Sequence, residues 1–162
     1  MHPLAVLIRL LDADNSAAAA LGVDGYGRLG AIRPGIFLYG VVTAPGLRPE
    51  PVVTLRARVV DIRWIEAGYT VSYDATYTAP TRMRIATTAV GYGDGYPRTL
   101  SHRAVAVLNG RPVPQRGLVT MDMTMFDVTD TQCEIGDVVT LIGDSTAADV
   151  SVETIARLAE MS

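Results

Sequence analysis

Apolar and polar residues alternate along much of the chain after residue 52. Residues 53–60 and 82–87 follow this two-residue period, which predicts half-buried antiparallel strands. Residues 104–108 lead into Asn109-Gly110, a dipeptide that favours the tight turn of a β-hairpin. Residues 138–142 form a further apolar run of strand length. Many short strands separated by turns predict a closed or nearly closed β-structure.

The end of the chain has a helical period instead. The apolar positions within residues 152–159 fall on one face of a helix, and Ser151 can cap its start. We therefore predict a mainly β fold, with a barrel-like β-domain over residues 45–162.

Residues 1–44 follow a different pattern. The alanine run 17–20 predicts a helix whose start Asn15 or Ser16 can cap. Residues 36–39 are a short apolar run, typical of a strand buried on both faces of a parallel sheet. Residues 44–51 contain three prolines and predict a linker. We therefore expect residues 1–44 to be a short α/β segment that cannot close a core of its own.

Composition and charge argue against several classes of function. The net charge is -3 without a basic run, which disfavours nucleic-acid binding. Hydrophobic residues make up 49% of the chain, yet no apolar run reaches the roughly 20 residues of a membrane span. One cysteine and two histidines leave neither a disulfide nor a plausible metal site. The first residues lack the basic region of a signal peptide, so we expect a cytoplasmic protein.

Residues 25–30 match the pattern G-x-G-x-x-G. A dinucleotide-binding fingerprint follows a strand and opens a helix. Here the predicted helix precedes the glycines and the predicted strand follows them, so we interpret this segment as a connecting loop.

The chain contains no lysine, because all 14 of its basic residues are arginines. A Walker phosphate loop needs its lysine, and so does any enzyme that forms a Schiff base with a carbonyl compound. Neither mechanism can be completed within this chain.

Five segments, in order, resemble those of alanine racemases. Arg33–Gly40 (RPGIFLYG), Val71–Ala79 (VSYDATYTA) and Val90–Arg98 (VGYGDGYPR) resemble the family's RPGI-x-LYG, SYGATYTA and GYADGYPR segments. Asn15–Ala18 resembles its NSAA segment, and Thr120–Asp122 its MD segment. The resemblance implies that residues 1–44 are the end of a pyridoxal 5'-phosphate (PLP) binding β/α barrel and that the rest is the family's C-terminal β-domain. It also implies a homodimer or a complementing barrel-containing polypeptide, which the apolar excess would face.

The resemblance assigns roles in the interconversion of L- and D-alanine. Racemisation removes the α-proton from one face of the substrate and returns a proton to the other, so it needs two bases, and PLP supplies an electron sink. Tyr73 stands where the family has its tyrosine base. Tyr92 resembles a tyrosine that lines the substrate's route, and Met121 resembles a residue whose main chain contacts the substrate carboxylate. For Tyr73, packing in the core or at an interface is the alternative, and for Met121, packing in a strand core.

Four residues resemble the family's cofactor-binding groups. Arg33 corresponds to the arginine that donates to the pyridine nitrogen, which would keep that nitrogen unprotonated. Ser16 and the backbone amides of Gly35 and Ile36 correspond to groups around the phosphate. For Ser16 a plain helix cap is the alternative, and for Arg33 a surface ion pair.

Some features depart from the family pattern. The cofactor lysine is absent, Asp12 replaces a histidine near the arginine, and Asp74 replaces the glycine after the tyrosine. The resemblance also leaves most of the family's barrel, including its lysine, without a counterpart here. A fragment, a split subunit or a decayed gene product would each explain this. The alternative functions are a non-catalytic β-domain for dimerisation or a vestigial remnant, another amino-acid racemase or decarboxylase, and a generic ligand-binding β-barrel.

Overall fold

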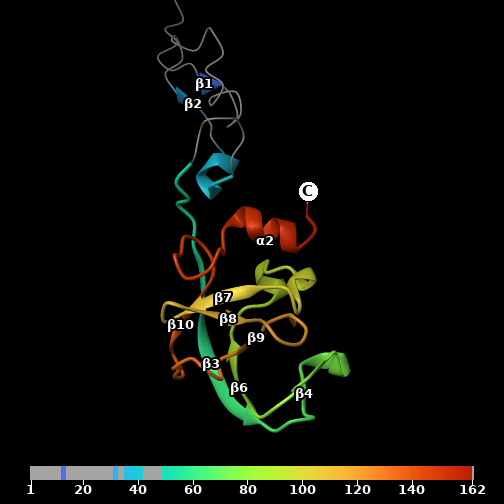
Figure 1. Cartoon of the computed structure of the whole chain (residues 1–162). Helices are drawn as coiled ribbons and strands as arrows, with labels where there is room; N and C mark the ends of the chain where they lie inside the picture. The colour runs from blue at the N-terminus through green and yellow to red at the C-terminus, as the bar shows by residue number, and fades with distance from the viewer. Residues whose placement is uncertain (1–11, 14–30, 33–34, 42–48, 162) are drawn as a thin grey trace, which may run out of the picture. The chain divides into compact units, whose positions relative to one another are not determined.

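The computed structural model describes residues 12–13, 31–32, 35–41 and 49–161 (Figure 1). The chain divides into two compact units, residues 1–52 and 53–162. In the first unit, β1 (Asp12–Ala13) pairs in parallel with β2 (Ala31–Ile32). Parallel pairing is typical of α/β structures. The helix predicted at residues 17–20 lies outside the described residues.

The prediction of a buried strand over residues 36–39 is wrong. These residues form the 3-10 helix η2 (Ile36–Tyr39), and Ile36, Leu38 and Tyr39 are exposed. Gly40 adopts the left-handed conformation with φ 83°, and its N–H donates to the Phe37 carbonyl at 3.1 Å. A run of four apolar residues holds no period that separates helix from strand. The glycine that follows the run provides the turn that ends a helix.

The second unit is built on one antiparallel sheet in the order β8-β7-β10-β3-β6-β9. Its strands are β3 (Leu55–Ile65), β6 (Met83–Thr88), β7 (Val105–Leu108), β8 (Arg111–Pro114), β9 (Thr124–Asp127) and β10 (Val138–Ile142). Gln115, just after β8, forms a bridge with Phe126 of β9, which joins the two edges of the sheet. The result is the nearly closed, mainly β fold that the sequence predicts.

The main core fills the inside of this sheet. It includes the fully buried Phe126, Tyr96, Leu100, Leu108 and Leu141. The helix α2 (Val152–Leu158) contributes Ile155, and Ser151 caps its start by accepting from the Thr154 N–H at 3.3 Å, as predicted. Among the described residues, no helix has the length and apolar character needed to cross a membrane.

A smaller apolar cluster lies on the other face of β3, β6 and β9. The register of β3 against β6 shifts between Val59 and Asp61, as a β-bulge does. Val59 points into the main core, whereas Ile65, beyond the bulge, packs on the second cluster. The cluster consists of Val71, Ala79, Met83, Ile85 and Met125. It supports a small hairpin formed by β4 (Thr70–Val71) and β5 (Tyr77–Thr78), which Figure 1 places at the opposite end of the sheet from α2.

Candidate functional site

Tyr73 lies at the tip of the small hairpin. Val71 pairs with Tyr77, and the residues between them form the 3-10 turn η3 (Tyr73–Ala75). Ser72, Asp74 and Ala75 have φ angles of 68°, 59° and 50°. This turn sends the Tyr73 side chain outwards, where it is 70% exposed. Tyr73 is therefore a surface residue and not part of the core.

Tyr92 begins a second 3-10 turn, η4 (Tyr92–Asp94). The Asp94 carboxylate accepts from the Gly91 N–H at 3.0 Å and so closes the turn. Asp94 is thus an exposed turn residue whose carboxylate has a structural partner.

The Tyr92 turn is joined to the segment that carries Met121. The Tyr92 N–H donates to the Thr120 carbonyl, and the Gly93 N–H donates to the Met121 carbonyl, both at 2.9 Å. A Cβ on Gly91 would lie 2.2 Å from the Thr120 carbonyl oxygen, so only glycine permits this approach. The two segments are held together through backbone atoms.

Tyr73, Tyr92 and Met121 line one open hollow of about 190 Å³. The structure thus brings together all the residues for which the sequence predicts catalytic and substrate-binding roles. The hollow is also lined by Arg98, Leu118, Val119, Thr120, Asp122 and Met123. Met121, Met123 and Met125 alternate along the sequence, which would be consistent with packing in a strand core. However, Met121 and Met123 are exposed and only Met125 of the three is buried.

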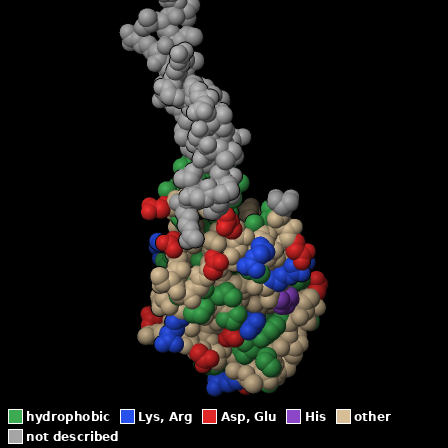
Figure 2. Space-filling view, turned by 45° about the horizontal axis from the view of Figure 1, so that its top comes forward, with side chains coloured by type: hydrophobic (Ala, Val, Ile, Leu, Met, Phe, Trp, Pro, Cys, Tyr) green, Lys and Arg blue, Asp and Glu red, His purple; other side chains and the backbone are tan. Residues whose placement is uncertain are grey.

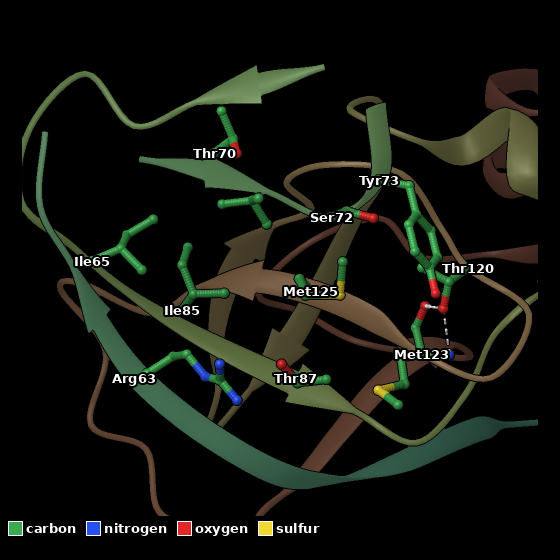
Figure 3. Close-up of a pocket in the computed structure, with 11 residues that line it drawn as sticks. Arg63, Ile65, Thr70, Ser72, Tyr73, Ile85, Thr87, Thr120, Met123 and Met125 are labelled. Carbon is green, nitrogen blue, oxygen red and sulfur yellow. Dashed lines mark hydrogen bonds between the residues drawn. The ribbon is translucent and has the colours of Figure 1, made fainter. Parts of the chain in front are cut away.

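A larger cavity of about 360 Å³ adjoins the hollow beneath the hairpin (Figure 3). Tyr73, Thr120 and Met123 line both spaces. Figure 3 shows the Tyr73 ring extending from its turn towards Thr120 and Met123, while Ile65, Ile85 and Met125 form the apolar floor. The walls of the larger cavity are mostly apolar, and Arg63 from β3 is its charged residue.

The lining of the hollow includes one cationic residue, Arg98, and one acidic residue, Asp122. The Arg98 guanidinium lies 3.9 Å from the Asp74 carboxylate, and both side chains are more than half exposed. The sequence resemblance includes Arg98 at the end of the Val90–Arg98 segment but predicts no role for it. Its position three residues after Gly95, in the first residue of η5 (Arg98–Leu100), brings it to the hollow. Space-filling Figure 2 shows apolar side chains interspersed with charged ones on the face turned to the viewer.

The described residues cannot by themselves hold PLP covalently. Ser16 and Arg33 lie outside the described residues, so their predicted roles stay predictions. Gly35 and Ile36 are exposed at the start of η2, and a Cβ on Gly35 would meet open space. No lysine exists to form the bond to the cofactor aldehyde. Among the described residues no group of histidine, cysteine and carboxylate side chains could hold a metal ion.

Comparisons with known proteins show the family to which this domain belongs. The family model described as alanine racemase, C-terminal domain, matches residues 52–162. The alanine racemase of Symbiobacterium thermophilum is 40% identical over 153 residues, which cover 91% of this chain and 40% of that protein. The alanine racemase of Geobacter sulfurreducens is 38% identical over 150 residues, covering 89% of this chain and 39% of that protein.

Solved structures give the same result. The alanine racemase of Bacillus anthracis with bound L-Ala-P superposes with a TM-score of 0.78 at 32% identity, over 94% of this chain and 40% of that one. The Bartonella henselae alanine racemase with covalently bound pyridoxal phosphate gives 0.77 at 32% identity, over 93% and 41%. The chain therefore spans about two fifths of the length of these relatives.

Fold and site together define a β-barrel domain that displays tyrosines around a surface hollow. Tyr73, Tyr92 and Met121 are exposed, and the chain has no lysine to bind a cofactor covalently. The chain belongs to the alanine racemase C-terminal domain family.

Proposed function

We propose that this chain is the C-terminal part of an alanine racemase, in which Tyr73 acts as one of the two bases. The supporting observation is the meeting of Tyr73, Tyr92 and Met121 around one hollow. Residues 1–44 would end the barrel, and residues 45–162 would form the β-domain. The other base, a lysine that also binds PLP, would come from a barrel-containing polypeptide, and the assembled enzyme would be a dimer.

Three residues at the hollow would have different roles in the reaction. The exposed Tyr73 phenol would hold or take the α-proton on one face of the amino acid. Among the described residues no hydrogen bond uses the Met121 backbone N–H, so it can donate to the substrate carboxylate. Tyr92 would line the substrate's entry to the hollow. PLP, held elsewhere, supplies the electron sink when bound.

A phenol titrates near 10 in water, so Tyr73 would need cationic neighbours to act as a base near neutral pH. Arg98 lines the same hollow and offers such a charge. If Ser16, Arg33, Gly35 and Ile36 have the roles that the family resemblance implies, they would contact the cofactor from this chain's barrel segment. The reaction would be cytoplasmic and would provide D-alanine for peptidoglycan.

The test is a chiral assay of alanine racemisation with added PLP, for the chain alone and mixed with a separately expressed barrel half. We expect no activity alone and activity on mixing. Tyr73→Phe should abolish that activity, whereas Tyr69→Phe, at another exposed tyrosine, should leave it intact. Activity of the chain alone would overturn this proposal, because no lysine is present.

A second candidate is a non-catalytic domain that serves dimerisation. The absence of lysine and the exposed apolar side chains of Tyr73, Tyr92 and Met121 favour it. Folded components that associate without racemising alanine would support this candidate over the first.

A further inference from the structure

The turn that carries Tyr73 has an unfavourable backbone. Ser72 has φ 68° and ψ −169°, a region that belongs almost only to glycine, and Asp74 and Ala75 are also left-handed. Such conformations persist only where the surroundings impose them. Neighbouring contacts must therefore hold this turn in place.

Ser72 makes the contact that fastens the start of the turn. Its hydroxyl donates a 2.8 Å hydrogen bond to the Leu118 carbonyl, 46 positions along the chain. Gly117 lets the two segments touch, because a Cβ there would lie 2.6 Å from the Val71 carbonyl oxygen and 2.7 Å from the Ser72 Cβ. The turn rests directly on the backbone of residues 117–118.

The same segment also carries the other half of the site. Thr120 and Met121 accept the hydrogen bonds that hold the Tyr92 turn. Residues 117–121 therefore form a common support: Ser72 attaches at one end and Tyr92 at the other. At the far end of the Tyr73 turn, Thr76 Oγ1 lies 3.0 Å from His102 Nε2, an exposed contact that water can replace.

We propose that Ser72 is a positioning residue for Tyr73. Through the Leu118 carbonyl it holds the strained turn so that the phenol keeps one position relative to Met121 and Tyr92. Without the hydroxyl the turn relaxes to ordinary backbone angles, and the phenol moves away from the hollow. This inference rests on the proposed catalytic role of Tyr73.

The first experiment needs only the chain itself. With labelled tyrosines, Ser72→Ala is expected to shift the Tyr73 ring signals in the NMR spectrum. Amide exchange of residues 73–76 should accelerate by about tenfold or more as this part of the structure opens. As a control, Ser151→Ala removes a different hydroxyl–backbone hydrogen bond, in which Ser151 accepts from the Thr154 N–H at α2, and should leave Tyr73 unchanged. Unchanged Tyr73 signals and exchange in Ser72→Ala would overturn the proposal.

The second experiment uses the mixed, active enzyme. Displacing a reacting group by about 1 Å costs on the order of 100-fold, so Ser72→Ala should lower kcat by about 10-fold to 100-fold with KM little changed. In deuterated water, exchange of the α-hydrogen should slow for one enantiomer and persist for the other, since Tyr73 would serve one face only. Equal slowing of both enantiomers would indicate lost assembly and overturn the positioning role.

Ser72→Gly separates the hydrogen bond from the strain. Glycine adopts the backbone angles without strain but cannot bond the Leu118 carbonyl, so its turn has less tendency to relax. This variant should therefore be more stable than Ser72→Ala and lose less activity. An equal or greater loss of activity in Ser72→Gly would overturn the proposal that strain displaces the phenol. If the wild-type mixture is inactive, the proposed function fails, and the Tyr73 ring signals still decide whether Ser72 positions that side chain.

Discussion

The Asp74 carboxylate lies 3.9 Å from the guanidinium of Arg98, a residue that lines the hollow together with Tyr73. Asp74 is left-handed at φ 59°, a conformation that aspartate tolerates better than most residues. The turn therefore survives where the resembled family has glycine. The aspartate at position 74 also adds a negative charge, which partly neutralises the positive charge of Arg98 at the hollow.

Asp74→Asn should strengthen substrate binding in the mixed enzyme. Asparagine keeps the left-handed turn but removes a negative charge that would repel the substrate carboxylate near the hollow. Exposed ion pairs contribute about 0.2–1 kcal/mol, so KM for alanine should fall by at most about fivefold at low salt. The difference in KM should vanish at high salt because of screening.

Steady-state kinetics at two salt concentrations measure this effect. Asp130→Asn, at an exposed carboxylate after β9, is the control. A KM that rises at low salt would contradict it.

The sequence predicts the strands of the β-domain well because their signals are local. Residues 138–142 match β10, and Asn109 and Gly110 have φ 49° and 73°, the left-handed pair that a tight hairpin turn between β7 and β8 requires. The observed β3 runs on to Ile65 past a bulge, which no alternation reveals.

The site could be predicted only in part. Motif resemblance selects Tyr73, Tyr92 and Met121, but their meeting depends on contacts between segments far apart in the chain, such as Ser72 with Leu118. In the Tyr73 turn the residues with positive φ are Ser72, Asp74 and Ala75. Because none of them is a glycine, the sequence gives no sign of these backbone angles. Tertiary contacts override local preference there.

Gly91→Ala should disrupt the support of the Tyr92 turn. The new Cβ would lie 2.2 Å and 2.3 Å from the carbonyl oxygens of Thr120 and Met121, and backbone atoms cannot move aside as flexible side chains do. We expect a loss of about 3 kcal/mol in the free energy of unfolding, at the upper end of overpacking costs. Urea unfolding measures it. Gly35→Ala, where a Cβ meets open space, should leave the same transition in place. Equal stability of both variants would exclude this close approach.

Thr124→Val should destabilise the residues that lead into the Tyr92 turn. The buried Thr124 hydroxyl donates to the Val90 carbonyl at 2.7 Å, and valine has nearly the same shape without the hydroxyl. The unpaired carbonyl should cost about 1–3 kcal/mol. Thermal unfolding checks this, with Thr140→Val in β10 as the control, since no side-chain hydrogen bond is seen for Thr140 in the described structure. A neutral Thr124→Val would show that water satisfies the carbonyl.

Tyr96→Phe should stabilise the domain, most of all at alkaline pH. Tyr96 is fully buried, and its hydroxyl has no hydrogen-bond partner among the described residues. Burial raises the pKa of Tyr96 well above its usual value. Folded Tyr96 therefore keeps its proton when the unfolded phenol, with a pKa near 10, ionises, so wild-type stability should fall as pH rises above about 10. Phenylalanine removes both the orphan hydroxyl and this pH-dependent loss, with a gain of about 1 kcal/mol at pH 7 that grows above pH 10. Urea unfolding across this pH range measures the difference.

The control is Tyr69→Phe, at an exposed ring, which should show neither effect. A Tyr96→Phe variant that is less stable than the wild type would instead reveal a hydrogen bond from the Tyr96 hydroxyl to a buried water.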